Sequence, residues 1–333
     1  MVTTSVGDMT SAFAFRAKNL SLKTEMQRLS TELTTGQTTD IAKKFSGNLS
    51  LVSGIDTSLA RIKGYTAQTQ EAGLFTTTMQ AGLQTIDSLA LQLRQSLMTV
   101  SAGSGTAQLS GVGGEAQQIF QSTIAALNVA VGGRSLFGGV ETAIVPVAGS
   151  QSILTALDAA TAGATSVQDV IAAVSNWFQD PAGFATQAYN GGAPLEPVTI
   201  APGETANLDI TAKDPAITET LTGIALAALL GRGLFSAQPD LRRSLAEAAG
   251  THLLQSQSHR LELSARLGVT ESQISAAETR NSSEESALQI ARNDLTSVDP
   301  YSTATKLQET QTQLETIYAL TARMSHLSLL DYL

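Results

Sequence analysis

The chain has 333 residues, of which 42% are hydrophobic and 5% aromatic, which is enough apolar material for two or more domains with cores of their own. The net charge of −9 at pH 7, from 29 acidic and 20 basic residues, leaves no basic footprint for nucleic acid or for an anionic membrane surface. The lack of cysteine excludes disulfides, thiolate metal sites and a cysteine nucleophile.

The composition favours long helices over sheets rich in aromatic residues. We predict a mainly α protein, in which both chain ends form a long antiparallel helical rod or coiled coil and a small α/β domain is inserted in the middle. The most apolar run, Ile224 to Leu230, is too short to span a membrane. Residues 1–30 lack the pattern of a cleaved signal peptide, so we expect any export to use another route.

The first segment, residues 1–42, is predicted to be the N-terminal helix of a terminal helical domain. It has two rows of apolar residues that repeat every seven positions, as in a coiled coil. Asn19 interrupts the rows as a polar residue placed to fix the register, and Gly36 is expected to end the helix. The residues of this segment that we predict to contact a partner are Phe15, Leu22, Met26, Leu29 and Leu33.

Residues 43–139 are predicted to form a long helical hairpin of a rod domain. Apolar residues recur there in steps of three and four, first from Val52 to Ile62 and then, after a slip of phase, from Met79 to Val100. A helix of such length with a narrow apolar seam needs antiparallel neighbours or other subunits to cover it. The plain alternative is that the seam forms the inside of a monomeric bundle.

The middle segment, residues 140–222, differs from the rest of the chain in composition. It holds six of the eight prolines and the only tryptophan. Its pattern predicts a short amphipathic helix from about Val167 and a β-hairpin in which Val198–Ile200 and Leu208–Ile210 flank a Pro-Gly turn. We therefore predict a small α/β insert that faces outward from the rod.

Residues 223–298 are predicted to be the returning helices of the rod domain. A long polar helix is expected from about Asp240 to Val298. Its main apolar positions are predicted to be Leu253, Leu254, Leu261, Leu267, Ile274, Leu288 and Leu295.

The last segment, residues 299–333, is predicted to be the C-terminal helix of the terminal domain. Asp299 followed by Pro300 is typical of a helix N-cap with proline at the first helical position. An apolar C-terminus in an acidic protein is expected either to enter a core or to contact another subunit. The residues that we predict to take part in assembly are Leu314, Ile317, Leu320, Met324, Leu327 and Leu330.

No motif in the chain supports an enzyme. His252 and His259 lie two turns apart on a predicted helix, roughly 10 Å, which is too far to share one metal ion. The glycine-rich stretches lack the pattern of a phosphate-binding loop, and the acidic residues are scattered on a polar face. We therefore predict no catalytic residue, no metal site and no cofactor.

Three stretches resemble the bacterial flagellin family: the early helix from Leu29 to Gly36, the Leu127-Asn128 helix end with the Gly133 to Gly139 turn behind it, and the closing Leu314 to Leu333. Within the family, the Gly133 to Gly139 turn and the last seven residues look most like the hook–filament junction protein, hook-associated protein 3. The resemblance frames nearly the whole chain apart from residues 140–215.

The resemblance implies a structural subunit of the bacterial flagellum that joins the hook to the filament. Its terminal helices would pair in an inner tube, with the rod around them and the insert outside. Implied partners are copies of itself, the hook-side junction protein, flagellin and an export chaperone, with no nucleic acid and no membrane. The implied location is extracellular, on the flagellum, after type III export without a cleavable signal.

Two other interpretations remain open on the sequence. The first is a filament-forming flagellin, which would polymerise alone into long filaments. The second is an unrelated coiled-coil surface or fibre protein, which would form a parallel trimer.

Overall fold

A computed structural model describes residues 6–100 and 105–330 of the chain. It is mainly helical, as predicted, and divides into two compact units: residues 1–63 with 283–333 (unit 1), and residues 64–282 (unit 2). None of the helices in the described ranges is long and apolar enough to cross a membrane. In chain order the elements are α1 (Val6–Thr35), α2 (Ile41–Lys44), α3 (Ser50–Met98), α4 (Thr106–Leu127), β1 (Ala130–Val131), β2 (Arg134–Ser135), α5 (Ser150–Thr161), α6 (Val167–Gln179), α7 (Phe184–Gln187), β3 (Val198–Ala201), β4 (Glu204–Ala206), α8 (Pro215–Gly231), α9 (Pro239–Thr296) and α10 (Pro300–Leu330).

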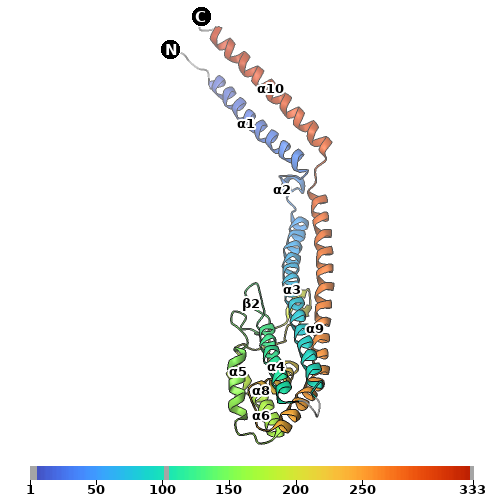
Figure 1. Ribbon diagram of the computed structural model, residues 1–333. Coiled ribbons are helices and arrows are strands. Elements are labelled where there is room, and N and C mark those ends of the chain that lie inside the picture. Colours follow the sequence, from blue (N-terminus) through green and yellow to red (C-terminus); the bar gives the residue numbers. More distant parts are fainter. Residues whose placement is uncertain (1–5, 101–104, 331–333) are drawn as a thin grey trace. The chain divides into compact units, whose positions relative to one another are not determined.

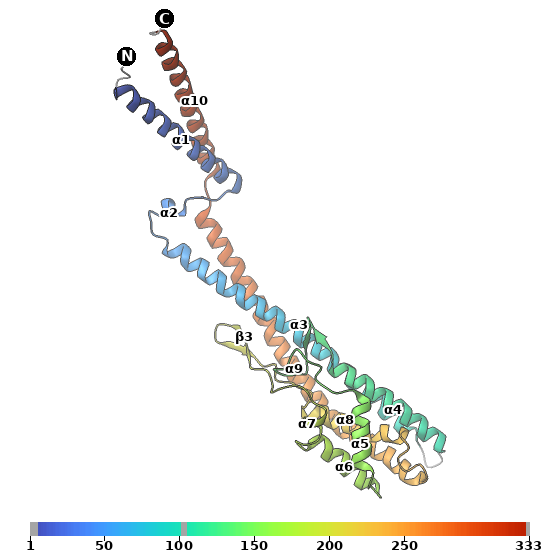
Figure 2. The same cartoon turned by 90° about the vertical axis from the view of Figure 1, so that its left-hand side faces the viewer.

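Unit 1 brings the two ends of the chain together. The first helix, α1, and the last, α10, lie side by side in both views (Figures 1 and 2). The same unit holds the start of α3 and the end of α9, where Arg292 donates to Asp56 at 2.6 Å. The predicted pairing of helices from the two chain ends is confirmed.

The helix ends in unit 1 lie at residues that commonly end or begin helices and that can be recognised in the sequence. Gly36 ends α1 with a φ of 70°, a left-handed conformation that glycine adopts without a steric penalty. At α10 the carboxylate of Asp299 accepts a hydrogen bond from the Tyr301 amide at 3.1 Å, and Pro300 takes the first helical position. Both predicted boundaries are confirmed.

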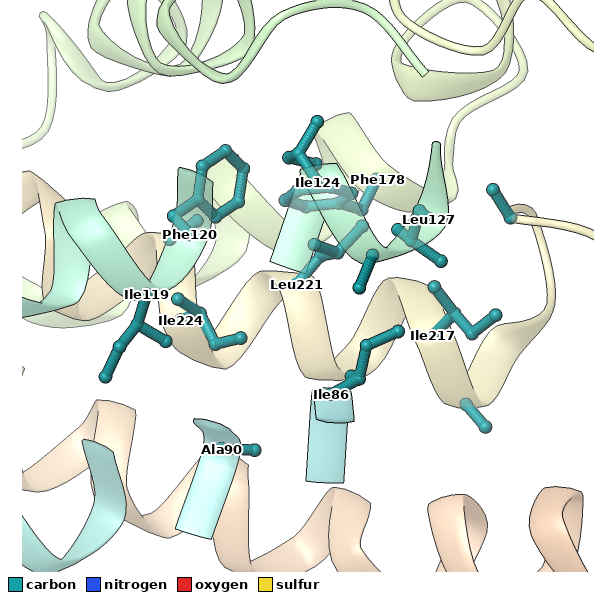
Figure 3. Close-up of a cluster of buried hydrophobic side chains, with 14 of the residues drawn as sticks. Ile86, Ala90, Ile119, Phe120, Ile124, Leu127, Phe178, Ile217, Leu221 and Ile224 are labelled. Carbon is teal, nitrogen blue, oxygen red and sulfur yellow. The ribbon is translucent and has the colours of Figure 1, made fainter. Parts of the chain in front are cut away.

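The core of unit 2 surrounds α8, which is buried along most of its length. Helix α4 packs along α8, while α5 and α6 pack on α8 and on each other. Figure 3 shows the apolar side chains of α3, α4, α6 and α8 that meet there, among them Ile86, Ala90, Ile119, Phe120, Ile124, Leu127, Phe178, Ile217, Leu221 and Ile224.

In unit 2, α3 lies antiparallel to α9 through a seam that is partly polar. Thr69 and Thr76 are fully buried in the α3 half of the seam, and each hydroxyl donates to a carbonyl of the preceding turn. On α9, the buried Arg260 donates to Asp87 at 2.8 Å and to the Ser256 hydroxyl at 2.7 Å. Polar groups can be buried at this seam because these contacts satisfy most of their hydrogen-bonding capacity.

The polar seam corrects the prediction for α9. Leu254 and Leu261 were predicted among the main apolar positions of this helix, but they are 52% and 56% exposed. The predicted Leu253, Leu267 and Ile274 are buried, and Ser256 and Arg260, which were not predicted, are buried with them. The prediction was wrong at Leu254 and Leu261 because the buried polar residues have hydrogen-bond partners that the sequence does not reveal.

The segment between α4 and α8 contains the predicted short helix, as α6, and a β-hairpin. Strands β3 and β4 are antiparallel around Pro202-Gly203, but β4 ends at Ala206, so the predicted second strand at Leu208–Ile210 is wrong. The Asn281 side chain of α9 donates to the carbonyl of Ile200 at 2.8 Å and so fixes the hairpin to that helix.

The crossing of α4 and α8 depends on two glycines. A β-carbon at Gly113 would lie 2.3 Å from the backbone nitrogen of Gly231, closer than non-bonded atoms approach. Backbone therefore touches backbone at this point, and no side chain can be accommodated between the helices.

We predict that Gly113→Ala destabilises the protein by about 1–3 kcal/mol, because the new methyl group overpacks the helix crossing. The matched control is Gly111→Ala on the same helix, where nothing lies within 4 Å of the new atom. That change should be neutral or stabilising by up to about 1 kcal/mol, the gain in helix propensity. Thermal and urea unfolding measure both; equal effects would show that the close approach is not a constraint.

Candidate assembly interface

The contact between α1 and α10 in unit 1 buries predicted residues of α1 and threonines of α10 that were not predicted. On α1, Leu22 and Leu29 are buried, with Leu29 only 2% exposed. On α10, Thr303 and Thr310 are buried, with Leu307 half-buried between them. The pair therefore buries alternate turns of each helix and leaves their other faces open.

The predicted assembly residues fall into three groups in the single chain. Leu22 and Leu29 are buried, whereas Phe15, Met26, Leu314 and Ile317 are half-buried. Leu33 and Leu320 are exposed. The side chains of Met324, Leu327 and Leu330 lie outside the described part of the structure, although the backbone there belongs to α10.

A polar contact fixes one point of the α1–α10 pair. The ammonium of Lys23 lies 5.8 Å from the centre of the Tyr318 ring, a cation–π distance. Hydrogen bonds from Lys23 and then from Asn19 lower the pKa of the Tyr318 phenol. Asn19, the polar interruption noted in the sequence, thus makes a specific contact across the pair.

The end of α1 carries a chain of three charged side chains. Arg28 donates through its Nε to Glu25 at 2.9 Å and through its Nη1 to Glu32 at 2.6 Å. The hydrogen bond from Arg28 is the main reason that the pKa of Glu25 falls below its ordinary value. The spacing of three and four residues places all three groups along one side of the helix.

The outer side of α1 presents a second apolar row. Phe13 is 75% exposed and Leu20 is 68% exposed, seven residues further along. Beside the pair, a groove of about 480 Å³ is lined by Met26, Gln27, Ser30, Thr31, Leu307 and Gln311. The paired helices thus bury one apolar row of α1 against α10 while another remains open to a neighbour.

Several of these residues were missed on the sequence. The seven-residue interval between Phe13 and Leu20 is itself a signal, hidden because the stronger row through Leu22 and Leu29 was assigned first. Thr303 and Thr310 gave no apolar signal at all. The charged triad could have been found from its spacing.

The titratable side chains of the described residues do not cluster around a metal position. These residues contain no group of three or more His, Asp or Glu side chains that could hold a metal ion. His259 accepts or donates one hydrogen bond with Glu219 at 2.6 Å, which is the main reason that the pKa of His259 rises. Burial lowers the pKa of His252, which lies on the same helix.

The C-terminal residues match a known protein family. Residues 255–333, which include most of α9 and all of α10, match the family described as the bacterial flagellin C-terminal helical region. No functionally curated protein sequence matches the chain at a significant level.

Solved structures of similar fold cover most of the chain. A protein described as a flagellar hook-associated protein from Vibrio parahaemolyticus is 12% identical, with a TM-score of 0.51 over 72% of this chain and 94% of its own. FlgL of Bacillus cereus is 13% identical, with a TM-score of 0.51 over 72% of this chain and 98% of its own. Residues 255–333 of this chain are thus similar to the flagellin C-terminal helical region, and the chain shares its fold with these two flagellar proteins.

Proposed function

We propose that the chain is a structural subunit of the bacterial flagellum that joins the hook to the filament and assembles with copies of itself through α1 and α10. The flagellin C-terminal region and the fold of hook-associated proteins support a structural, non-enzymatic role in the flagellum. They argue against an unrelated coiled-coil fibre protein.

The single observation that carries the assembly mechanism is that α1 has two apolar rows, one buried within the chain and one exposed. One apolar row, through Leu22 and Leu29, is already buried against α10 within the chain. The second row, Phe13 and Leu20, is exposed in the single chain. Burying a large apolar side chain contributes about 1.5–3 kcal/mol, so the second row favours contact with a neighbouring subunit.

The predicted assembly residues that are not buried within the chain would contact neighbouring subunits in this mechanism. Leu33 and Leu320 are exposed in the single chain and would be covered by neighbours, together with the half-buried Phe15, Met26, Leu314 and Ile317. We propose that the end of α10, with Met324, Leu327 and Leu330, extends the same contact. The proposed partners beyond copies of the chain are the hook-side junction protein, flagellin and an export chaperone. The proposed location is outside the cell after type III export.

We predict that the double change Phe13→Ser and Leu20→Ser abolishes or strongly weakens self-assembly without unfolding the monomer. The loss of about 1.4 kcal/mol or more per contact would raise the protein concentration needed for assembly at least tenfold. Sedimentation of the purified protein and attachment of filaments to cells that carry the variant measure this loss.

The matched control is Leu74→Ser, which replaces another exposed leucine, on α3 in unit 2. It should assemble like the unmodified chain, and the circular dichroism of all variants should agree. Undiminished assembly of the double variant would contradict the proposed interface.

A second experiment separates the junction protein from a filament-forming flagellin. We expect the purified chain to add a short layer to isolated hooks and to form no long filaments alone at any concentration. Electron microscopy of the chain with and without hooks decides this. Long filaments from the purified chain would favour the flagellin alternative.

A further inference from the structure

The turn that follows α1 is paired with the turn that precedes α10. The amide of Thr38 donates to the carbonyl of Thr296 at 2.8 Å, and the amide of Val298 donates to the carbonyl of Gly36 at 2.9 Å. Gln37 and Ser297 face each other as an isolated antiparallel bridge. We call these two segments, residues 36–38 and 296–298, the strand bridge.

Glu32 holds the α1 side of this bridge. Its side chain lies one turn before Gly36 and the residue is 3% exposed. One carboxylate oxygen accepts from the Thr38 hydroxyl at 3.0 Å, the Thr39 amide at 2.9 Å and the Thr39 hydroxyl at 3.2 Å. The other accepts from Arg28 at 2.6 Å.

The carboxylate is charged despite its burial. Burial by itself would raise the pKa of Glu32, but the hydrogen bonds from Thr39, Thr38 and Arg28 together outweigh it and keep the pKa below the ordinary value. A buried carboxylate persists only where its oxygens are well satisfied. Three of the four contacts are made to the turn that follows α1, so the group stabilises the conformation of that turn.

The strand bridge lies directly between the end of α1 and the start of α10, so it can restrict how these two helices shift against each other. Gly36 directly follows the last residue of α1, and Val298 precedes Pro300, the first residue of α10, by two positions. A shift of α1 against α10 by one residue, about 1.5 Å of helix, would break both backbone hydrogen bonds of the bridge. The bridge therefore fixes the two helices at the point where they meet.

We propose that Glu32 is a positioning residue for assembly: it holds the turn at residues 36–40 so that the strand bridge forms, and the bridge sets the register of α1 against α10. Glu32 itself need not contact a neighbouring subunit. The effect on the bridge is independent of function, whereas the effect on assembly rests on the proposed function.

Amide hydrogen exchange of the full chain tests the first step. In Glu32→Ala, exchange at Thr38 and Val298 should become at least tenfold faster, while exchange at the core residues of α8 stays unchanged. The matched control is Glu25→Ala, which removes the other carboxylate partner of Arg28 but no contact to the turn. It should change exchange at the two bridge amides by less than twofold. Unchanged exchange in Glu32→Ala, or an equal effect of Glu25→Ala, would overturn the assignment.

Glu32→Gln separates the turn contacts from the ion pair with Arg28. Its amide oxygen still accepts from Thr38 and Thr39, so we expect bridge exchange to fall between that of the unmodified chain and that of Glu32→Ala. Exchange as fast as in Glu32→Ala would assign the effect to the ion pair and overturn the role of the turn contacts.

A disulfide across the bridge tests the second step. The paired residues do not exchange hydrogen bonds directly, a geometry with α-carbons about 4.5 Å apart and within disulfide range. Because the chain has no cysteine, Gln37→Cys with Ser297→Cys can form only that intramolecular bond. In the Glu32→Ala background, the oxidised form should regain slow exchange at the bridge and recover assembly, and reduction should remove both. The same cysteine pair with Glu32 intact is the control.

Recovery of bridge protection without recovery of assembly would overturn the role of the bridge in setting the register. Failure of the unmodified chain to assemble under any condition would count against the proposed function alone. In that case the exchange measurements still decide whether Glu32 holds the bridge.

Discussion

The pairing of the first helix with the last is the contact on which the architecture of unit 1 depends. Joining two segments so far apart in sequence costs loop-closure entropy. A modest apolar seam can stabilise such a contact only if another part of the fold already holds the two segments close together. The long helices α3 and α9 hold the segments close together, because they run antiparallel and return the chain to its starting point. The contact of Asp56 with Arg292, inside unit 1, lies next to the segments that lead to α1 and α10.

The helix boundaries and the pairing of the chain ends could be predicted because local rules encode them. Gly36 ends α1 through its left-handed backbone, and Asp299 with Pro300 begins α10 through a cap. The seven-residue rows of α1 likewise needed only the sequence. The polar members of the buried row along α9 could not be predicted, because Arg260 is buried on account of Asp87, whose position depends on the fold.

The candidate interface shows the same division. Leu22 and Leu29 are apolar residues at helical spacing, and their burial follows from that pattern. The contacts of Tyr318 with Lys23, and of Glu32 with Thr38 and Thr39, join polar groups whose partners become evident only once the two turns and the two helices have met. Hydrophobic periodicity locates the seam, whereas directional polar contacts fix one helix against the other.

The core of unit 2 bears on how freely the middle of the chain can vary. Leu127 at the end of α4 and Ile217 near the start of α8 meet in one cluster, and Phe178 of α6, from the segment between them, belongs to the same cluster. Since α5 and α6 pack on the buried α8, the apolar residues of this segment can change only together with the helices that they contact. Divergence among relatives is therefore expected at the exposed positions of residues 140–214 and not across the whole segment.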